Sequence, residues 1–277
     1  MRTLTPKQRE LRHREDRILA VASPLIRDGG IGSVSIGQIA KAMNYTRGTI
    51  YNHFPHKEDI LVSLASRAVG RRIRLFELAI ESQSLTRDRI AAVGLAAEVY
   101  VDTMPDDFAV EQIIRHEPVW RKSSEARRQV LSQCETRCIG LVGGVVRDAI
   151  ESGDLVVSRP ATVDETVQHI VFGLWSLVYG GLVLQATSPS LRVSGIDDPR
   201  QTIRRNCNRL LDHFGWQPLH DARRYHALIR RVVPRLNAAA VDIGAGPAVD
   251  IGAGPATDIG AGPAVDIGAD PAVGAAE

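Results

Sequence analysis

The sequence predicts an all-α protein, in which a short helix-turn-helix hairpin near the N-terminus precedes a larger helical bundle. Apolar residues recur at i, i+3, i+4 and i+7 along most of the first 237 residues, which is the spacing of helices with one buried face. Helix caps and helix stops separate these segments. No segment of strand length alternates apolar and polar residues convincingly, so no sheet is expected.

The first helix is expected to run from Thr5, as its cap, to the Gly29-Gly30 pair. Pro6 suits its first position, where a missing N–H has no partner in any case. Its apolar stripe consists of Leu11, Ile18, Val21, Ala22 and Leu25. Pro24 lacks the N–H that would bond to the preceding turn, so we expect a kink there.

Residues 34–57, VSIGQIAKAMNYTRGTIYNHFPHK, predict two short helices joined by a tight turn. Ser35 and Gln38 form a capping box that begins the first of them. Asn44 lies where the chain must turn with positive φ, a conformation that Asn tolerates. Thr46 caps the second helix, which Pro55 prevents from continuing beyond residue 54.

The second helix of the hairpin presents its polar side chains to solvent, because its apolar residues are needed for packing. Arg can pair with guanine O6 and N7, Thr can meet a thymine methyl, and Tyr, His and Lys suit phosphate oxygens. The candidate DNA contacts are Thr46, Arg47, Gly48, Thr49, Tyr51, Asn52, His53 and Lys57. The alternative is an ordinary helical hairpin with a solvated polar face.

The segment from about Glu10 to Ser66 resembles the DNA-binding domain of the TetR family, the tetracycline-repressor-like regulators. The resemblance is carried by Ile18, Ala22, Gly30, Ser35, Ile36, Ile39, Ala40, Thr46, Gly48, Thr49, Ile50, Tyr51, His53, Phe54, Lys57, Glu58 and Ile60. It implies that Arg47 and Thr49 contact bases, and that phosphates are held by Thr46, Tyr51, His53 and Lys57.

Three positions depart from the family pattern, and one of them is Pro24, which interrupts the first helix. Asn44 stands where the family usually has a turn glycine, which the tolerance of Asn for left-handed backbone explains. His56 replaces the usual Ser or Asn cap of the fourth helix, so that helix start is expected to be weaker by about 1 kcal/mol.

The chain divides into three expected parts: residues 1–60 as the DNA-binding domain, residues 61–237 as a ligand-binding and dimerisation domain, and residues 238–277 as a disordered tail. The tail repeats an AVDIGAGP-like octapeptide and carries six acidic residues and no Lys or Arg. Residues 1–237 therefore hold 34 Lys and Arg against 26 Asp and Glu, a modest excess that suits a polyanion. A tail that competes with DNA for the basic domain is the functional alternative to simple disorder.

The second domain is expected to contain helices at about 57–83, 87–104, 107–117, 124–152, 162–186 and 199–214. Residues 219–236 are amphipathic, with five arginines largely on one side, which fits either an additional packed helix or a solvated basic face.

The 162–186 helix is apolar on nearly every side, so it lies either at the centre of the bundle or against another subunit. The TetR resemblance implies a homodimer joined by a four-helix bundle. The candidate interface residues are Phe172, Gly173, Ser176, Gly180, Ile203, Leu210 and Phe214. Two-fold symmetry would predict a palindromic double-stranded DNA operator.

The resemblance also implies a small-molecule effector bound among the middle helices. The candidate lining is Tyr100, Met104, Phe108, His116, Trp120, Cys134, Cys138, Trp175 and Tyr179, a mainly apolar and aromatic set that suits a small hydrophobic or aromatic ligand. Ordinary core packing is the alternative for each of them. No His lies at ligand spacing from Cys134 and Cys138, so neither a metal nor another cofactor is expected.

The leading hypothesis is a ligand-responsive transcriptional repressor without catalytic activity. The alternatives are an architectural DNA-binding protein without an effector, and an all-helical enzyme acting on the pocket ligand. No GxSxG, HExxH, P-loop or dinucleotide fingerprint supports the enzyme.

A bacterial cytoplasmic, nucleoid-associated location is expected. The charged N-terminus lacks the apolar core of a secretory signal. The chain has only three cysteines, and its apolar run at 170–184 is short for a bilayer.

Overall fold

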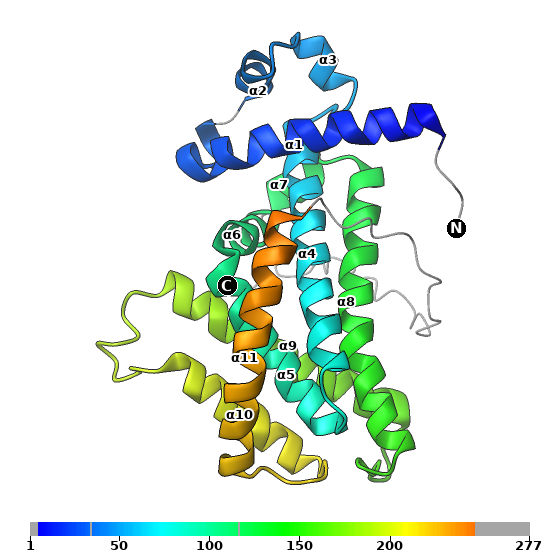
Figure 1. Cartoon of the computed structure of the whole chain (residues 1–277), viewed down its shortest axis with the longest axis vertical. Coiled ribbons are helices and arrows are strands. Elements are labelled where there is room, and N and C mark those ends of the chain that lie inside the picture. The colour runs from blue at the N-terminus through cyan, green and yellow to red at the C-terminus, as the bar shows by residue number, and fades with distance from the viewer. Residues whose placement is uncertain (1–4, 34, 116, 247–277) are drawn as a thin grey trace, which may run out of the picture.

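The computed structural model describes residues 5–33, 35–115 and 117–246. All regular secondary structure in these ranges is helical, which confirms the predicted all-α class. Figure 1 shows the short helices α2 and α3 at one end of the molecule, lying across α1, and the long helices running away from them.

The N-terminal part consists of α1 (Pro6–Ser33), α2 (Ile36–Ala42) and α3 (Arg47–Tyr51). They share a core in which the side chains of Ile18, Ile39, Ile50 and Phe54 are almost completely buried. Helix α1 continues through Pro24 and past the glycine pair at which the sequence analysis ended it. That end was wrong because glycine only disfavours a helix by about 1 kcal/mol, which the neighbouring turns can offset.

The larger part contains α4 (Lys57–Glu81), α5 (Thr86–Thr103), α6 (Pro105–Ile113), α7 (Glu117–Lys122), α8 (Glu125–Glu151), α9 (Val163–Thr187), α10 (Pro199–His213) and α11 (Ala222–Ala245). Helix α4 packs along α8 and α5, and α9 packs along α10. Because α4 begins beside α3 and extends deep into the bundle, it connects the two parts as one continuous rod (Figure 1).

The segment at 219–236, for which the sequence allowed either a packed helix or a solvated basic face, belongs to a packed helix. Helix α11 lies against α5 and α4 and buries Leu228, Val232, Leu236 and Ala240. It extends to Ala245, so the tail does not begin at residue 238 as expected. The reason is that the apolar spacing of α11 continues into the first repeat. The remaining repeats, 247–277, lie outside the described residues.

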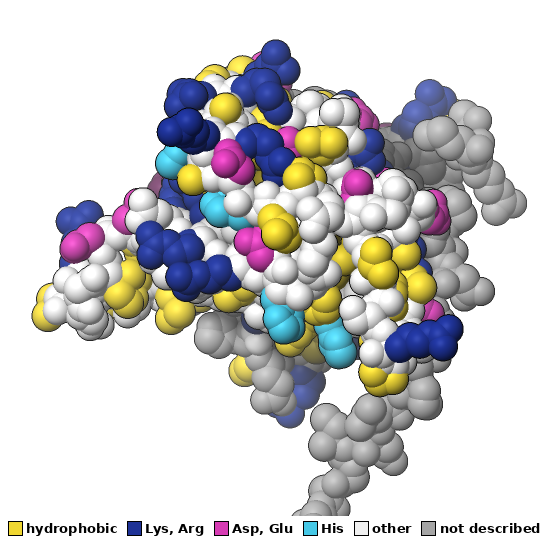
Figure 2. All heavy atoms as spheres, turned by 90° about the horizontal axis from the view of Figure 1, so that it is seen from below, with side chains coloured by type: hydrophobic (Ala, Val, Ile, Leu, Met, Phe, Trp, Pro, Cys, Tyr) yellow, Lys and Arg dark blue, Asp and Glu magenta, His cyan; other side chains and the backbone are white. Residues whose placement is uncertain are grey.

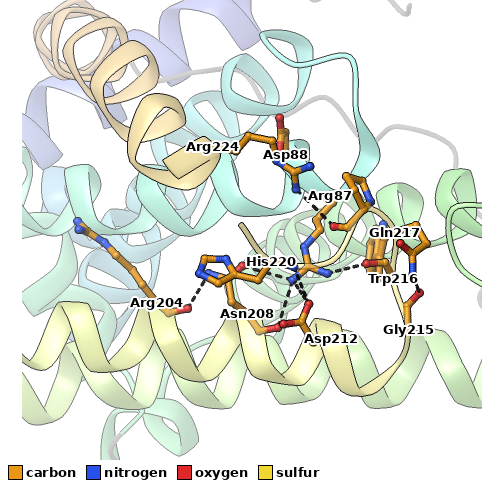
Figure 3. Close-up of polar contacts among 11 residues, drawn as sticks. Arg87, Asp88, Arg204, Asn208, Asp212, Gly215, Trp216, Gln217, His220 and Arg224 are labelled. Atoms are coloured by element: carbon orange, nitrogen blue, oxygen red, sulfur yellow. Dashed lines mark hydrogen bonds and ion pairs between the residues drawn. The ribbon is translucent and has the colours of Figure 1, made fainter. Parts of the chain in front are cut away.

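A buried arginine of α5 binds the end of α10 and the segment that connects α10 to α11. Arg87 of α5 is only 2% exposed, donates from Nη1 to the carbonyl oxygen of Trp216 at 2.6 Å, and pairs through Nη2 with Asp212 at 2.6 Å. Figure 3 shows its side chain reaching from α5 to these partners. The Trp216 indole, itself fully buried, donates to the hydroxyl of Thr86 at 3.0 Å. Burial lowers the pKa of Arg87, and Asp212 opposes that shift.

Helix α9 combines apolar composition with exposure. Among the described residues it is the one helix long and apolar enough to cross a bilayer, by length and composition only. Phe172 is 69% exposed and Leu184 is 56% exposed.

In Figure 2, which views the end opposite α2 and α3, Lys and Arg side chains are interspersed with acidic and hydrophobic ones. That end therefore lacks the single-sign surface that a polyanion would require.

Candidate DNA-binding surface and effector cavity

The helix-turn-helix hairpin forms as its local sequence predicts. The Ser35 hydroxyl accepts from the Gln38 N–H at 3.3 Å, and the Gln38 side chain accepts from the Ser35 N–H at 2.9 Å. Asn44 has φ of 55°, the left-handed conformation expected at the turn. The Thr46 hydroxyl caps α3 by accepting from the Thr49 N–H at 3.1 Å. These bonds fix the angle at which α3 leaves the domain.

Most of the candidate DNA contacts are exposed on and beside α3. The exposed ones are Thr46, Arg47, Gly48, Tyr51, Asn52 and Lys57, whereas Thr49 and His53 are half-buried. Helix α3 is shorter than expected and ends at Tyr51. His53 therefore follows the helix, and its carbonyl oxygen accepts from Arg127 at 3.3 Å.

The guanidinium of Arg47 lies against α2. A Cβ placed on Gly37 would be 3.0 Å from both Nε and Nη2 of Arg47. Such a contact is closer than van der Waals separation, so Gly37 provides the space in which the Arg47 side chain lies. The sequence analysis did not identify Gly37, although a glycine in the first turn of a seven-residue helix is a recognisable signal.

The start of α4 is stabilised differently from the expected pattern. Asp59 is fully buried, and its Oδ2 accepts from the His56 N–H at 3.1 Å while its Oδ1 accepts from the Ser124 N–H at 2.6 Å. The helix start is therefore capped by the side chain of Asp59, the third residue of α4, which accepts from the His56 N–H. The same carboxylate joins α4 to the beginning of α8.

Arg127 of α8 is a second connection between the bundle and the N-terminal domain. Its Nη2 pairs with Glu15 of α1 at 2.7 Å, and its guanidinium lies 4.9 Å from the ring centroid of Phe54. Because Phe54 is fully buried beside α3, Arg127 connects α8 both to α1 and to the residues that follow α3.

A cavity of about 130 Å³ lies among α4, α5, α6, α8, α9, α10 and the first turn of α11. Five of the predicted lining residues do line it: Tyr100, Phe108, Cys138, Trp175 and Tyr179. Three do not: Met104, Trp120 and Cys134. His116 lies outside the described residues.

The three misplaced candidates have different surroundings. Met104 and Cys134 are buried in the core, and Trp120 is 38% exposed on α7. Cys134 shares a helix face with Cys138, but the face is long enough to contact different neighbours at its two ends. Periodicity gives the face of a helix and not the element that covers it.

The charged residues of the cavity wall were missed. Glu98 is buried and accepts from Nε of Arg204 at 2.8 Å, while the Tyr179 hydroxyl accepts from Gln112 at 2.7 Å and from Arg115 at 2.8 Å. The sequence does contain a signal for a buried charge here, because Glu98 interrupts the otherwise apolar IAAVGLAAEVYV segment. Buried charged residues of this kind occur in pairs or at binding sites.

A second buried pair lies between α4 and α6. Arg72 donates from Nη1 to Oε2 of Glu111 at 2.5 Å, and the Tyr100 hydroxyl donates to Oε1 at 2.6 Å. Arg72 is 9% exposed and Glu111 is 1% exposed. Burial acts to lower the pKa of Arg72, but Glu111, Cys138 and Tyr100 together outweigh it and the pKa is raised, so the guanidinium stays charged. Only Arg72 of this pair lines the cavity.

All three thiols are held in the protonated form. Burial raises the pKa of Cys134 to about 11 and that of Cys207 to about 12, and it also raises the pKa of Cys138. Within the described ranges, no group of three His, Cys, Asp or Glu side chains is placed to hold a metal ion.

The candidate interface residues fall into two groups. Ile203 is buried within its own chain, and Cβ atoms placed on Gly173 and Gly181 would lie 2.8 Å from Leu210 and 2.5 Å from Ile203. These glycines therefore allow α9 and α10 of one chain to approach each other. The sequence analysis had instead placed Gly173 at a contact between subunits. Phe214 is half-buried at the end of α10.

Along α9, a row at spacing of four remains open: Phe172, Ser176, Gly180 and Leu184. Phe172, Ser176 and Leu184 are exposed, and a Cβ on Gly180 would meet no other atom within 4 Å.

Comparisons with known proteins agree with this geometry. The profile of the bacterial regulatory proteins of the tetR family matches residues 18–64, the segment from the middle of α1 into α4. The chain is 26% identical over 189 residues to the fatty acid metabolism regulator protein of Bacillus subtilis, which covers 65% of this chain and 94% of that protein. It is 31% identical over 98 residues to the regulator EthR of Mycobacterium tuberculosis, covering 35% of this chain and 44% of EthR.

The fold is also shared with solved structures. The crystal structure of RolR in complex with its ligand resorcinol superimposes with a TM-score of 0.52 at 16% identity, covering 80% of this chain and 96% of RolR. The hairpin geometry, the family profile and the regulator relatives lead to one assignment. Residues 18–64 carry the helix-turn-helix DNA-binding domain of the tetR family of bacterial regulatory proteins, and the chain as a whole is similar to transcription regulators that contain it.

Proposed function

We propose that this protein is a homodimeric repressor that binds a palindromic operator and is released by a small, mainly apolar effector. In this proposal residues 1–60 bind DNA and the bundle from residue 61 onward dimerises and binds the effector. The observation that carries it is the capped α3 with its exposed Arg47, together with the exposed Lys57 at the start of α4.

The DNA contacts are proposed to divide into two kinds. Arg47 and Thr49 would contact base edges, while Tyr51, His53 and Lys57 would hold phosphates, with Gly48 and Asn52 close to the groove. Thr46 would contribute mainly as the cap, because its hydroxyl already bonds to Thr49. Base contacts give specificity and phosphate contacts give position.

This division has a direct test by gel-shift titration on operator and scrambled DNA. Arg47→Ala should weaken operator binding by about 1 to 3 kcal/mol and reduce the preference for operator. Lys57→Ala should weaken binding to both DNAs alike and lower the salt dependence. If the two variants behave identically, the assignment of these roles is wrong.

Dimerisation is supported by the open row on α9. An exposed phenylalanine such as Phe172 would gain about 2 kcal/mol on burial against a second copy. Phe172→Glu should therefore shift the protein towards monomer in sedimentation, whereas Phe172→Leu should not. A monomer mass for the unaltered protein at all concentrations would contradict the proposal.

The effector role is supported by the position of the cavity on α4. Arg72 and Phe76 line it, and Lys57 begins the same helix about 22 Å away at 1.5 Å per residue. The volume of about 130 Å³ approaches the roughly 150 Å³ apolar cavity that holds benzene in another protein. A single-ring compound, as resorcinol is in RolR, fits this size. An architectural DNA-binding protein would need neither the cavity nor the Asp59 and Arg127 connections.

A further inference from the structure

The cavity wall contains one polar atom without a partner. Nε of Arg72 is buried and makes no hydrogen bond, and among the described residues the only other such side-chain atom is Oγ of Ser63, which does not line the cavity. Leaving a buried donor unpaired is unfavourable, because the donor has lost its water partners and gained no other. Such an atom in a cavity wall therefore indicates a ligand group that accepts its hydrogen bond.

The charge around Arg72 restricts what that group can be. The guanidinium is already neutralised by Glu111, whose two oxygens are engaged by Arg72 and Tyr100. Two more carboxylates, Glu98 and Glu135, line the same cavity, and each is already paired with an arginine, Arg204 and Arg115 respectively. An ionised ligand carboxylate would add a further anion to this set without a free cation to balance it.

The rest of the wall is apolar, with Phe76, Val142, Val171, Leu174 and Ile203 among its side chains. We propose, resting on the effector role above, that the effector is a small uncharged molecule with an apolar body and one acceptor oxygen, a carbonyl or a phenolic hydroxyl, placed on Nε of Arg72. Arg72 thereby selects neutral oxygenated compounds over both hydrocarbons and carboxylates of the same size.

Three probes of similar size test this on the full chain by calorimetric titration: acetophenone, which has a carbonyl acceptor, ethylbenzene, which has none, and benzoate, which is anionic. Acetophenone should bind about tenfold or more tightly than ethylbenzene, as expected for one hydrogen bond from a charged donor. Benzoate should bind most weakly. Equal binding of acetophenone and ethylbenzene, tightest binding of benzoate, or no binding of acetophenone would overturn the proposal.

A substitution identifies the donor. Arg72→Lys keeps a cation for Glu111 but removes the Nε donor, so acetophenone should lose its advantage while ethylbenzene binds as before. Arg204→Lys, in the other arginine pair of the wall, is the matched control and should leave the advantage intact. An unchanged preference in Arg72→Lys would refute the assignment, and if that variant fails to fold the three-probe comparison still decides.

These titrations contain no DNA, so they are independent of whether α3 recognises an operator. Binding of acetophenone without release of DNA would leave the ligand assignment standing and would contradict the repressor proposal. Absence of operator binding would likewise contradict the proposed function alone.

Discussion

Gly37→Ala should stabilise the protein and weaken DNA binding at the same time. Alanine is favoured over glycine in a helix by about 0.5 to 1 kcal/mol, and Gly37 lies within α2. The new Cβ would lie 3.0 Å from Nε and Nη2 of Arg47. Because Arg47 is exposed, its flexible end can move away at little cost, so the free energy of unfolding should increase by about 0.5 kcal/mol.

The effect on DNA should have the opposite sign. If Arg47 must lie along α2 to meet a base, its displacement removes a contact worth about 1 to 3 kcal/mol, or about 5- to 150-fold in affinity. Urea unfolding and gel-shift titration measure the two effects. Gly140→Ala is the control, because a Cβ there meets nothing within 4 Å and the residue lies in α8. It should stabilise without changing DNA affinity.

A double-mutant cycle tests whether Gly37 acts through Arg47. Once Arg47→Ala has removed the side chain, adding Gly37→Ala should cost no further affinity, since coupled positions are not additive. Full additivity of the two effects, or an unchanged affinity of Gly37→Ala, would refute the reasoning.

Three further outcomes are expected. Asp59→Asn should lower the free energy of unfolding by about 1 to 2 kcal/mol in urea, because the amide cannot accept from both backbone N–H groups; no loss would contradict the bridging role. Arg87→Met should lower it by about 2 kcal/mol, since the carbonyl oxygen of Trp216 loses its donor and Asp212 loses its partner, whereas Arg147→Met, in an exposed pair, should cost less than about 0.5 kcal/mol. The folded thiols should react with a disulfide reagent at pH 8 about a hundredfold more slowly than in urea, because burial raises their pKa values. Those raised values favour the folded state below about pH 9, and this contribution should be lost as pH rises towards 11 and 12; fast labelling of Cys134 or Cys207 would contradict their burial.

The DNA-binding hairpin was predictable because its determinants are local. The Ser35 capping box, the positive φ of Asn44 and the Thr46 cap each depend on residues within four positions in sequence. The end of α3 was misplaced because only tertiary packing decides that residues 52–54 leave the helix. The cap at Asp59 was missed because its second partner, Ser124, lies 65 positions away.

The cavity was only partly predictable because its wall is built from seven helices. The aromatic candidates Tyr100, Phe108, Trp175 and Tyr179 line it, as large apolar side chains in the middle of the chain are expected to do. Arg72 was overlooked although it lies on the buried face of α4 between Ala68 and Phe76. A charged residue on an apolar stripe is the sequence signal that would have found it.

Selection of binding sites from a random double-stranded DNA library tests the central claim most directly. The unaltered protein should enrich an inverted repeat whose half-sites are about one or more helical turns apart, and Arg47→Ala should lose the preference at specific base pairs within each half-site. Enrichment of no motif, or of a motif that Arg47→Ala selects equally well, would contradict the assignment of α3 as the recognition helix of a dimeric regulator.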